Sequence, residues 1–403
     1  MDEPLKVCLK ATAIQELPDS SVDLVGLYYL DMTGCEKLVY LPSSLFTLTK
    51  FVTLKVGGCP QLGGSFARFR ESLSTAAECR PSNLETLDFS HASLCDEDIH
   101  VITQSFPKLE VLNASSNNFV SIPAACIQQS SYLTSLDLSY CLDLHEIPEL
   151  PSSVRKVDAR HCSSLSANTS SMLWSQVRKE INKLQVVMPT ANKEIPQWWD
   201  HHGNFQDSTQ YPTFEARGKF PVVALAFVFG KMNYQSVELH LSIDSRDVHF
   251  AHRPWHNFTV AEDHVLMCDL RVLFSDEEWK TLDACVGHDD EWKTVEVKFV
   301  PNIIPVQWGV YVYKEETSMK DIDLWSVDEE RSSRYNPVHS RKKRLSSSEE
   351  LAIIASFSES LQTVVENLKR LMAPREEDQC LSLMQQDRDE EDEGDEGESD
   401  MEA

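Results

Sequence analysis

Long hydrophobic runs are missing from this 403-residue sequence. No apolar stretch reaches the ~18 residues needed to span a bilayer. The first four residues, Met-Asp-Glu-Pro, also lack the charged and apolar regions of a secretory signal. We therefore expect no membrane span and a cytoplasmic or nuclear location, or both.

The short motifs of common enzyme sites are absent as well. The chain contains neither the phosphate-binding pattern Gly-x-x-x-x-Gly-Lys-Ser/Thr nor the nucleophile pattern Gly-x-Ser-x-Gly. No cysteine pair accompanies its histidines at a spacing typical of zinc sites. We therefore expect that the protein is not an enzyme, needs no metal or other cofactor, and has no small-molecule substrate.

Positive charge is scarce, with 37 Lys and Arg against 64 Asp and Glu and a net charge of −27. About half of the excess lies in the last 28 residues, which hold 14 acidic residues and one basic residue. The rest of the chain is only moderately acidic, so its charge still disfavours broad binding to nucleic acid. The length leaves room for two or three domains with substantial cores.

The sequence does contain an internal repeat. Between residues 84 and 165 the pattern apolar-x-x-apolar-x-apolar-x-x-Asn/Cys recurs, which is typical of leucine-rich repeats. Further copies begin at Leu27 and Phe51, and the central apolar residue recurs at positions 30, 54, 87, 112, 136 and 157. The long step between 54 and 87 contains residues 63–82, which we interpret as an insertion loop. The segment 11–18 resembles the second half of a repeat, which suggests a fragment of a longer protein or a truncated gene product.

The physics of such a repeat predicts which side chains are available for binding. A single coil cannot bury its own apolar face, so coils stack and cover one another. The residues beside each central apolar residue point to the open face of the sheet. We predict that this concave face binds a protein, against the alternative that its side chains are merely solvated. The nominated residues are Tyr29, Asp31, Lys55, Asp88, Asn113, Asp137, Asp158 and Arg160.

Eleven cysteines would suit a disulfide-rich secreted protein, but four of them occupy the repeat-turn position. These four are Cys35, Cys59, Cys141 and Cys162. We interpret them as free structural thiols in a reducing compartment. The Asn-x-Ser/Thr sequons at Asn113, Asn168 and Asn257 are then coincidental.

A second region begins at Ile-Pro-Gln-Trp-Trp, residues 195–199, after a segment in which residues 174–184 suit a short amphipathic helix. Its β-branched and alternating runs predict strands at 222–229, 237–243, 264–270, 294–299 and 308–313. Short strands separated by turns suggest a β-sandwich. We nominate Trp198, Trp199 and Trp255 as aromatic anchors for a protein partner, with sandwich core as the alternative. Core is the interpretation that we favour for Trp292 and Trp308.

Other polar clusters have simpler interpretations. The histidines His201, His202, His249, His252 and His256 match no strong metal-site spacing, so we expect loop or surface histidines. The acidic clusters at 276–278 and 289–291 suit solvated loop charge better than paired catalytic carboxylates. The basic run Arg341, Lys342, Lys343 and Arg344 is a candidate nuclear localisation signal, or else a solvated run before a helix.

Several motifs carry a family resemblance. These are Thr-Ala-Ile-x-Glu-Leu-Pro at 12–18, Cys-x-x-Leu-x-x-Leu-Pro-x-Ser-Leu at 35–45, and Asp-Ala-Arg-x-Cys-x-x-Leu at 158–165. They resemble plant disease-resistance receptors that combine a TIR domain, a nucleotide-binding domain and leucine-rich repeats. The motifs around Trp198, Trp292 and Trp308 resemble the jelly-roll and immunoglobulin-like domain (C-JID) that follows those repeats. The chain departs from that pattern at His-His-Gly-Asn, residues 201–204.

The resemblance implies a function. In that family the repeats and the C-terminal domain together recognise a pathogen effector protein in the plant defence response. The NAD-cleaving TIR domain and the nucleotide-binding domain have no counterpart in this sequence, so neither activity is transferred to it. The resemblance therefore implies the sensing part of an intracellular plant immune receptor. The alternative is a stand-alone regulatory or decoy protein that binds a full-length receptor or an effector without signalling itself.

We thus predict an α/β leucine-rich-repeat solenoid, an all-β sandwich and a disordered acidic tail, in an oligomeric state that the sequence leaves open. The expected boundaries are 1–172 for the repeats, 173–193 for a connecting helix and linker, 194–325 for the sandwich, 326–348 for a basic linker, 349–373 for an amphipathic helix, and 374–403 for the tail.

Overall fold

The computed structural model describes residues 4–63, 83–128, 130–179, 183–190, 194–204, 212–248, 255–287, 291–300 and 303–324. All of them belong to one compact unit, Met1–Glu329. The predicted amphipathic helix, the acidic tail and the basic run Arg341–Arg344 lie outside the described residues. The helices of the described part include none that is long and apolar enough to cross a membrane.

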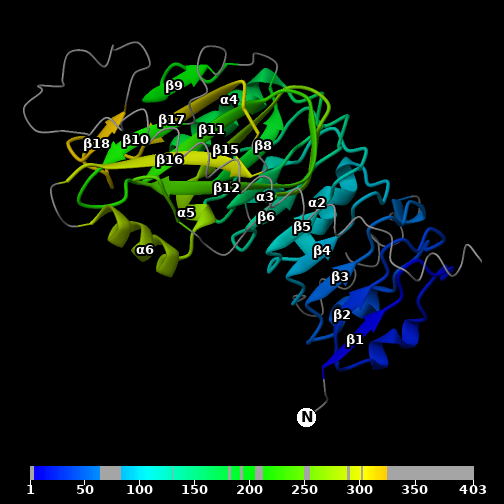
Figure 1. The fold of residues 1–403 in the computed structure, drawn as a ribbon. Helices are drawn as coiled ribbons and strands as arrows, with labels where there is room; N and C mark the ends of the chain where they lie inside the picture. Colours follow the sequence, from blue (N-terminus) through cyan, green and yellow to red (C-terminus); the bar gives the residue numbers. More distant parts are fainter. Residues whose placement is uncertain are drawn as a thin grey trace, which may run out of the picture. The chain divides into compact units, whose positions relative to one another are not determined.

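The repeats form a ladder of short parallel strands (Figure 1). These strands are β1 (Leu5–Cys8), β2 (Leu27–Asp31), β3 (Thr53–Lys55), β4 (Thr86–Asp88), β5 (Val111–Asn113), β6 (Ser135–Asp137) and β7 (Lys156–Asp158). The central apolar residues pair in sequence order, Leu30 with Leu54, Leu54 with Leu87, and so on to Val157. The predicted repeat register is therefore confirmed. Strand β1 adds a coil before the first complete copy of the pattern.

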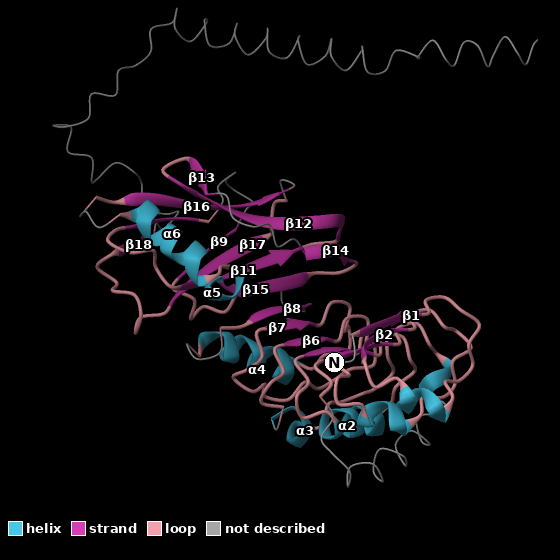
Figure 2. Cartoon of the chain, turned by 90° about the horizontal axis from the view of Figure 1, so that it is seen from below, coloured by secondary structure: helices cyan, strands magenta, loops and turns pink. Residues whose placement is uncertain are grey.

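The opposite side of each coil carries helical or irregular segments (Figure 2). They include helices α2 (Asp96–Ser105) and α3 (Ala124–Gln128), and the 3₁₀ helices Asp19–Asp23 and Ser43–Thr47. Apolar residues from both sides of the coils, such as Leu87, Ile102 and Phe106, are buried in one shared cluster. Each coil thus covers its neighbour's apolar face, as a stack of repeats requires.

The repeat ladder continues past the last recognisable repeat. Helix α4 (Ala167–Arg178) starts earlier than the predicted segment 174–184, and Ser166 caps it by accepting a hydrogen bond from the Thr169 N–H. Strand β8 (Gln185–Pro189) then pairs in parallel with β7. The prediction of a connecting helix and linker over 173–193 is wrong for β8. Its five residues lack the leucine spacing of the other coils, so no repeat pattern marks them.

Strand β8 joins the repeats to the second region, because β15 (His264–Asp269) pairs with its other edge in antiparallel direction. The same sheet continues through β11 (Val223–Phe229), β17 (Gln307–Val312) and β9 (His201–Asn204). In the part of the chain that the structure describes, this sheet has twelve strands, from β1 to β9. Repeats and second region therefore share one continuous backbone hydrogen-bond network.

A second sheet, six-stranded among the described residues, packs against the end of the first. Its strands are β10 (Thr213–Ala216), β12 (Met232–Ile243), β13 (Arg246–Val248), β14 (Trp255–Val260), β16 (Lys293–Val300) and β18 (Ile322–Leu324). The side chains of Phe227, Phe229, Phe258 and Phe299 contact one another between the two sheets. The five strands predicted for this region are confirmed as β11, β12, β15, β16 and β17.

Strand β11 shows why its sequence is apolar without interruption. All seven residues are buried. Ala224, Ala226 and Val228 face the cluster shared with the repeats, whereas Phe227 and Phe229 face the second sheet. A strand covered on both faces needs apolar residues at every position.

Two helices interrupt the strands of the second region, which the prediction of an all-β region omits. Helix α5 (Leu270–Leu273) is followed by α6 (Asp276–Val286). Ser275 and Glu278 cap α6 reciprocally through each other's backbone N–H groups. The acidic run at 276–278 is therefore the first turn of a helix rather than loop charge, and acidic residues there are favoured by the helix dipole.

Candidate protein-binding face and its junction

The residues that flank each buried central residue form two rows along the sheet, and two of them, Asp31 and Asp158, are themselves buried. The first row is Tyr29, Thr53, Thr86, Val111, Ser135 and Lys156. The second row is Asp31, Lys55, Asp88, Asn113, Asp137 and Asp158. Seven of the eight residues nominated for the concave face lie in these rows, and Arg160 follows the last strand. The pattern in the sequence thus places them on a common face.

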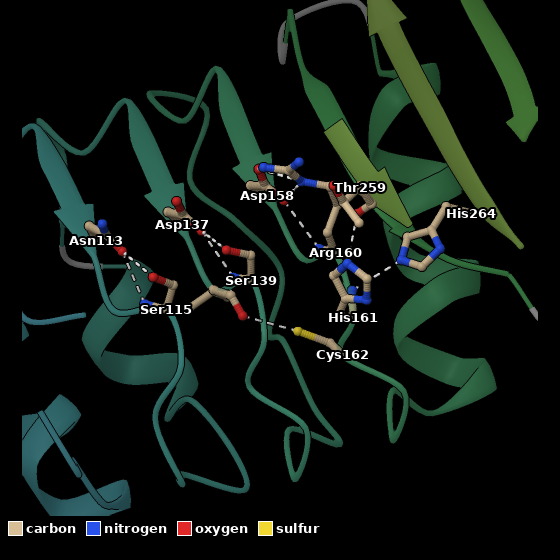
Figure 3. Close-up of polar contacts among 11 residues, drawn as sticks. Asn113, Ser115, Asp137, Ser139, Asp158, Arg160, His161, Cys162, Thr259 and His264 are labelled. Carbon is tan, nitrogen blue, oxygen red and sulfur yellow. Dashed lines mark hydrogen bonds and ion pairs between the residues drawn. The ribbon is translucent and has the colours of Figure 1, made fainter. Parts of the chain in front are cut away.

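Most second-row side chains also form a hydrogen bond that stabilises the turn after their strand. The Asp or Asn side chain accepts a hydrogen bond from the backbone N–H two residues later, as Asn113 does from Ser115 at 3.1 Å and Asp137 from Ser139 at 3.0 Å. The hydroxyls of Ser115 and Ser139 donate to the same side chains (Figure 3). This contact turns the chain out of the strand. The recurring Asp/Asn-x-Ser/Thr signal in the sequence would have revealed it.

Tyr29 lies within a basic cluster at the N-terminal end of the face. The amines of Lys6 and Lys55 lie 4.3 and 6.0 Å from its ring centroid. Its hydroxyl donates to buried Asp31 at 2.9 Å, and Lys10 pairs with the same carboxylate at 3.1 Å. Burial disfavours the charged form of Asp31, but hydrogen bonds from Thr33, Tyr29 and Lys10 outweigh it and lower its pKa to about 2. The hydrogen bond to Asp31 is the main reason why the pKa of Tyr29 rises to about 12.

The other end of the face is bounded by the second region. Arg160 pairs with Asp158 through its Nε and Nη2 atoms, at 2.8 to 3.0 Å from the carboxylate oxygens. Its guanidinium also lies 5.5 Å from the ring centroid of Phe258 in β14. Asp137 in the adjacent strand β6 has a raised pKa, first because it is buried and second because the Asp158 carboxylate lies nearby. The nominated Asp158 and Arg160 therefore contact each other, and Arg160 also contacts the second region.

The repeat-turn cysteines are buried and free, as the spacing predicts. The thiol of Cys162 donates to the Leu138 carbonyl at 3.1 Å, and that of Cys141 to the Ala114 carbonyl at 3.3 Å. Burial raises the pKa of Cys59 to about 11 and that of Cys141 to about 12. The four thiols donate to backbone carbonyls of the preceding coil, and those of Cys59 and Cys141 stay protonated at neutral pH.

His161 joins the last repeat to the second region. Its Nε2 atom donates to the Thr259 carbonyl of β14 at 2.7 Å, and its backbone N–H donates to Nε2 of His264 at 3.0 Å (Figure 3). The ring of Tyr140 stacks on His161 with centroids 4.2 Å apart. No sequence motif pairs His161 with a residue that follows 103 positions later, so sequence reasoning missed this contact.

A buried ion pair reinforces the same junction. Arg271 pairs with fully buried Asp269, with Nη2 2.6 Å from the carboxylate. Its guanidinium lies 4.6 Å from the ring centroid of Tyr313, whose hydroxyl donates to the Val177 carbonyl of α4 at 2.6 Å. Three segments that are distant in sequence are thus connected, and β15 and β17 are held against α4.

The nominated tryptophans are mostly packed inside. Trp199 and Trp255 are buried, whereas Trp198 is half-buried, with the Arg178 guanidinium 5.5 Å from its ring centroid. Trp308 is buried as the sequence predicts. Trp292 is 40% exposed, so its assignment to the core is wrong; it lies directly before β16, with the Arg217 guanidinium 4.7 Å from its ring centroid.

The structure describes the side chains of two of the five histidines named above, His201 and His202. His201 is buried in β9 against Trp308, and burial lowers its pKa, so the expectation of a loop or surface histidine is wrong there. His202 is exposed, His249 and His252 lie outside the described residues, and the side chain of His256 is not described. Among the described residues, no three His, Cys, Asp or Glu side chains are grouped so that they could hold a metal ion.

Comparison with known proteins identifies the repeats. Residues 1–184 match a family described as "Disease resistance protein RPS4B-like, leucine-rich repeats". Disease resistance protein RPS4B of Arabidopsis thaliana is 32% identical over 157 residues, which cover 39% of this chain and 12% of that protein. TMV resistance protein N of Nicotiana glutinosa is 30% identical over 159 residues, covering 34% of this chain and 13% of that protein. The chain thus spans only a small part of these relatives.

A solved structure of the leucine-rich repeat domain of the type III effector XCV3220 (XopL) overlaps 41% of this chain and 67% of that domain. The sequence identity is 18% and the TM-score is 0.29. The assignment of the repeats therefore stands on the family match and on the observed strand register. Most of the relatives found are disease resistance proteins of Arabidopsis thaliana.

Proposed function

We propose that this chain is the protein-binding, sensing part of an intracellular plant immune receptor and that it recognises a pathogen effector. The observation that carries the proposal is the concave face, on which side chains from six successive coils lie in register. Such faces commonly bind proteins along their length. The relatives of the repeats are disease resistance proteins, so an effector is the partner class that suits this face.

The second region contributes to the same surface in this proposal. We take it to be the jelly-roll and immunoglobulin-like sandwich that follows a repeat solenoid in such receptors. Its two sheets enclose a shared buried cluster, and β14 borders the concave face beside Arg160. An effector lying along the repeats would then meet a corner made by both regions.

The chemistry of the face suits binding rather than catalysis. Asp31 and Asp158 are held in ion pairs, and Asn113 and Asp137 form turns. The first row supplies Tyr29, Lys156, three small hydroxyl side chains and the partly exposed Val111. The affinity would come from contact area and a few anchors. We accordingly propose a binding protein without enzymatic activity, located in the cytoplasm, the nucleus or both.

The test compares two substitutions of the same kind at different places. Val111→Arg puts a large charged side chain on the concave face, where Val111 is 36% exposed. Val120→Arg is the matched control, since Val120 is 46% exposed but lies outside the strands. A two-hybrid screen of the chain against a library of pathogen effectors, followed by pull-down, should find a partner that the control binds and Val111→Arg loses. Equal binding by both variants would contradict the proposed face.

The alternative is a regulatory or decoy protein that binds a full-length receptor or an effector without signalling itself. Co-expression in leaves separates the two. A sensing part should give effector-dependent cell death only when it is joined to a receptor's signalling domains. A decoy should instead suppress the response of a full-length receptor to the same effector. A fluorescent fusion, with and without alanines at Arg341–Arg344, tests the location.

A further inference from the structure

One row of backbone hydrogen bonds runs through every coil. Three residues after each repeat strand, the chain adopts a left-handed conformation, with φ between 50° and 75°. The N–H of this residue donates to a carbonyl in the next coil at 2.7 to 2.9 Å. The donors are Ala11, Gly34, Gly58, His91, Ser116 and Tyr140, and the acceptors are Thr33, Gly57, Ser90, Ser115, Ser139 and Arg160. Each coil therefore supplies the acceptor that the preceding coil needs.

The row ends differently at His161, the left-handed residue of the last repeat, with φ 63°. Its N–H donates to the imidazole Nε2 of His264, at 3.0 Å, instead of to a carbonyl. The neighbouring row still continues in the usual way, from the Ala159 N–H to the Val187 carbonyl of β8 at 2.8 Å. One acceptor in the ladder is thus replaced by a side chain of the second region.

The course of β8 shows why the usual acceptor is missing. Val187 stands in the row that Asp or Asn occupies in β4 to β7. Unlike those residues it has no side-chain acceptor, and β8 runs straight on to Pro189 and pairs with β15. The strand therefore makes no turn like those of the earlier coils, and His264, opposite Pro189, provides the acceptor.

The environment of His264 defines its chemical state. The side chain is fully buried, and its Nδ1 lies 2.8 Å from the Glu262 carbonyl. Because Nε2 accepts from His161, the single ring proton must be on Nδ1, where it is donated to Glu262. The strand partners Pro189 and Phe229 do not titrate.

The groups around the His264 ring shift its pKa in opposite directions. Burial is the main cause that lowers the pKa of His264 to about 4, and it is assisted by His161 and Arg160. The Glu262 carbonyl and the Asp158 carboxylate act in the opposite direction. The neutral imidazole is thus the form present at neutral pH.

We propose that His264 is a positioning residue that substitutes for the missing next coil, and that its neutral imidazole holds the second region against the last repeat. Protonation would place an N–H at Nε2 directly opposite the His161 N–H. The contact would then become a repulsion between two donors, so the junction is sensitive to acid. This inference is independent of the proposed effector binding.

The test measures backbone amide exchange of the full chain by NMR, at pH 7 and pH 4, with rates corrected for the intrinsic effect of pH. Loss of one hydrogen bond should lower the protection of the His161 amide ~tenfold. Tyr140 is the internal control, because its N–H donates to the Arg160 carbonyl, which cannot titrate. In the wild-type chain, the His161 amide should lose protection at pH 4 while the Tyr140 amide keeps it.

Two variants test whether His264 acts as a hydrogen-bond acceptor or only fills space. His264→Gln keeps an acceptor near the Nε2 position and cannot titrate, so the His161 amide should stay protected at both pH values. The shorter side chain of His264→Asn reaches the Glu262 carbonyl but not the Nε2 position. The His161 amide should therefore lose its protection at both pH values. The assignment is overturned if His264→Asn protects His161 as well as the wild type does, or if His161 and Tyr140 lose protection in parallel at pH 4.

Discussion

Asn117 is the side chain whose loss should cost the repeats the most. It takes the repeat-turn position that cysteine occupies in four other coils, and it is 2% exposed. Its Oδ1 accepts from the N–H groups of Ala92 and Leu94 at 3.1 and 2.9 Å. Its Nδ2 donates to three carbonyls, those of Phe89, Ala114 and Ser115. One side chain therefore satisfies five backbone groups of two coils.

The expected magnitude follows from what Asn117→Ala leaves behind. Two buried N–H groups lose the acceptor they share, and an unsatisfied buried donor costs about 1 to 3 kcal/mol. The three carbonyls lose a donor as well, although a carbonyl tolerates this better than an N–H group does. We expect a loss of about 3 to 4 kcal/mol in the free energy of unfolding. In a protein stabilised by about 5 to 15 kcal/mol, this is a large fraction.

The assay is denaturant unfolding of the wild type, Asn117→Ala and the matched variant Cys141→Ala. Cys141 gives one weak hydrogen bond to the Ala114 carbonyl, so its removal should cost about 1 kcal/mol. Asn117→Cys should fall between the wild type and Asn117→Ala, because a thiol replaces only one of the contacts. If Asn117→Ala costs no more than Cys141→Ala, the reasoning that links backbone satisfaction to stability in this ladder is refuted.

Three further predictions concern the thiols, the ion pair and the pH dependence. Under native conditions a thiol reagent should modify the exposed Cys8 and Cys285 quickly and buried Cys141, whose pKa is about 12, only after unfolding; rapid native labelling of Cys141 would contradict its packing. Arg271→Met should lower the free energy of unfolding by about 3 to 5 kcal/mol because it leaves the buried Asp269 carboxylate unpaired, and a thermal melt that matches the wild type would exclude this. His264 has a folded-state pKa of about 4, below its ordinary 6.5, so its contribution is fully present above pH 6.5 and is lost as the pH falls through 4. The stability of the wild type relative to His264→Gln should therefore fall by about 3 kcal/mol from pH 7 to well below pH 4, and a constant difference would show that His264 does not titrate in this range.

The candidate face illustrates what a repeat pattern reveals. The spacing of Leu30, Leu54 and Leu87 is sufficient to place Asp31, Lys55 and Asp88 in one row, because stacked parallel strands keep equivalent residues side by side. The pattern does not reveal that Asp31 is buried and paired with Lys10. That contact depends on β1, a coil with only a partial repeat pattern.

The second region shows which strands can be predicted from the periodicity and composition of the sequence and which cannot. Strand β11 is recognisable because its seven residues are all apolar, and β16 because its residues alternate. The short strands β9 and β10 carry no comparable signal. Trp199 and Trp292 have the same residue type, yet only Trp199 is buried, because burial is decided by what packs on each ring.

The sequence alone determines the repeat, its register and the free thiols, because each coil repeats a local pattern that only its immediate neighbours must satisfy. Tertiary structure decides how the ladder ends. Strand β8 joins the two regions, and His264 supplies an acceptor to His161 across 103 positions. Such a contact leaves no local signal, since its partners are brought together only when β15 pairs with β8. The physical reason is that a backbone donor requires an acceptor at its position in space, from whichever segment the fold places there.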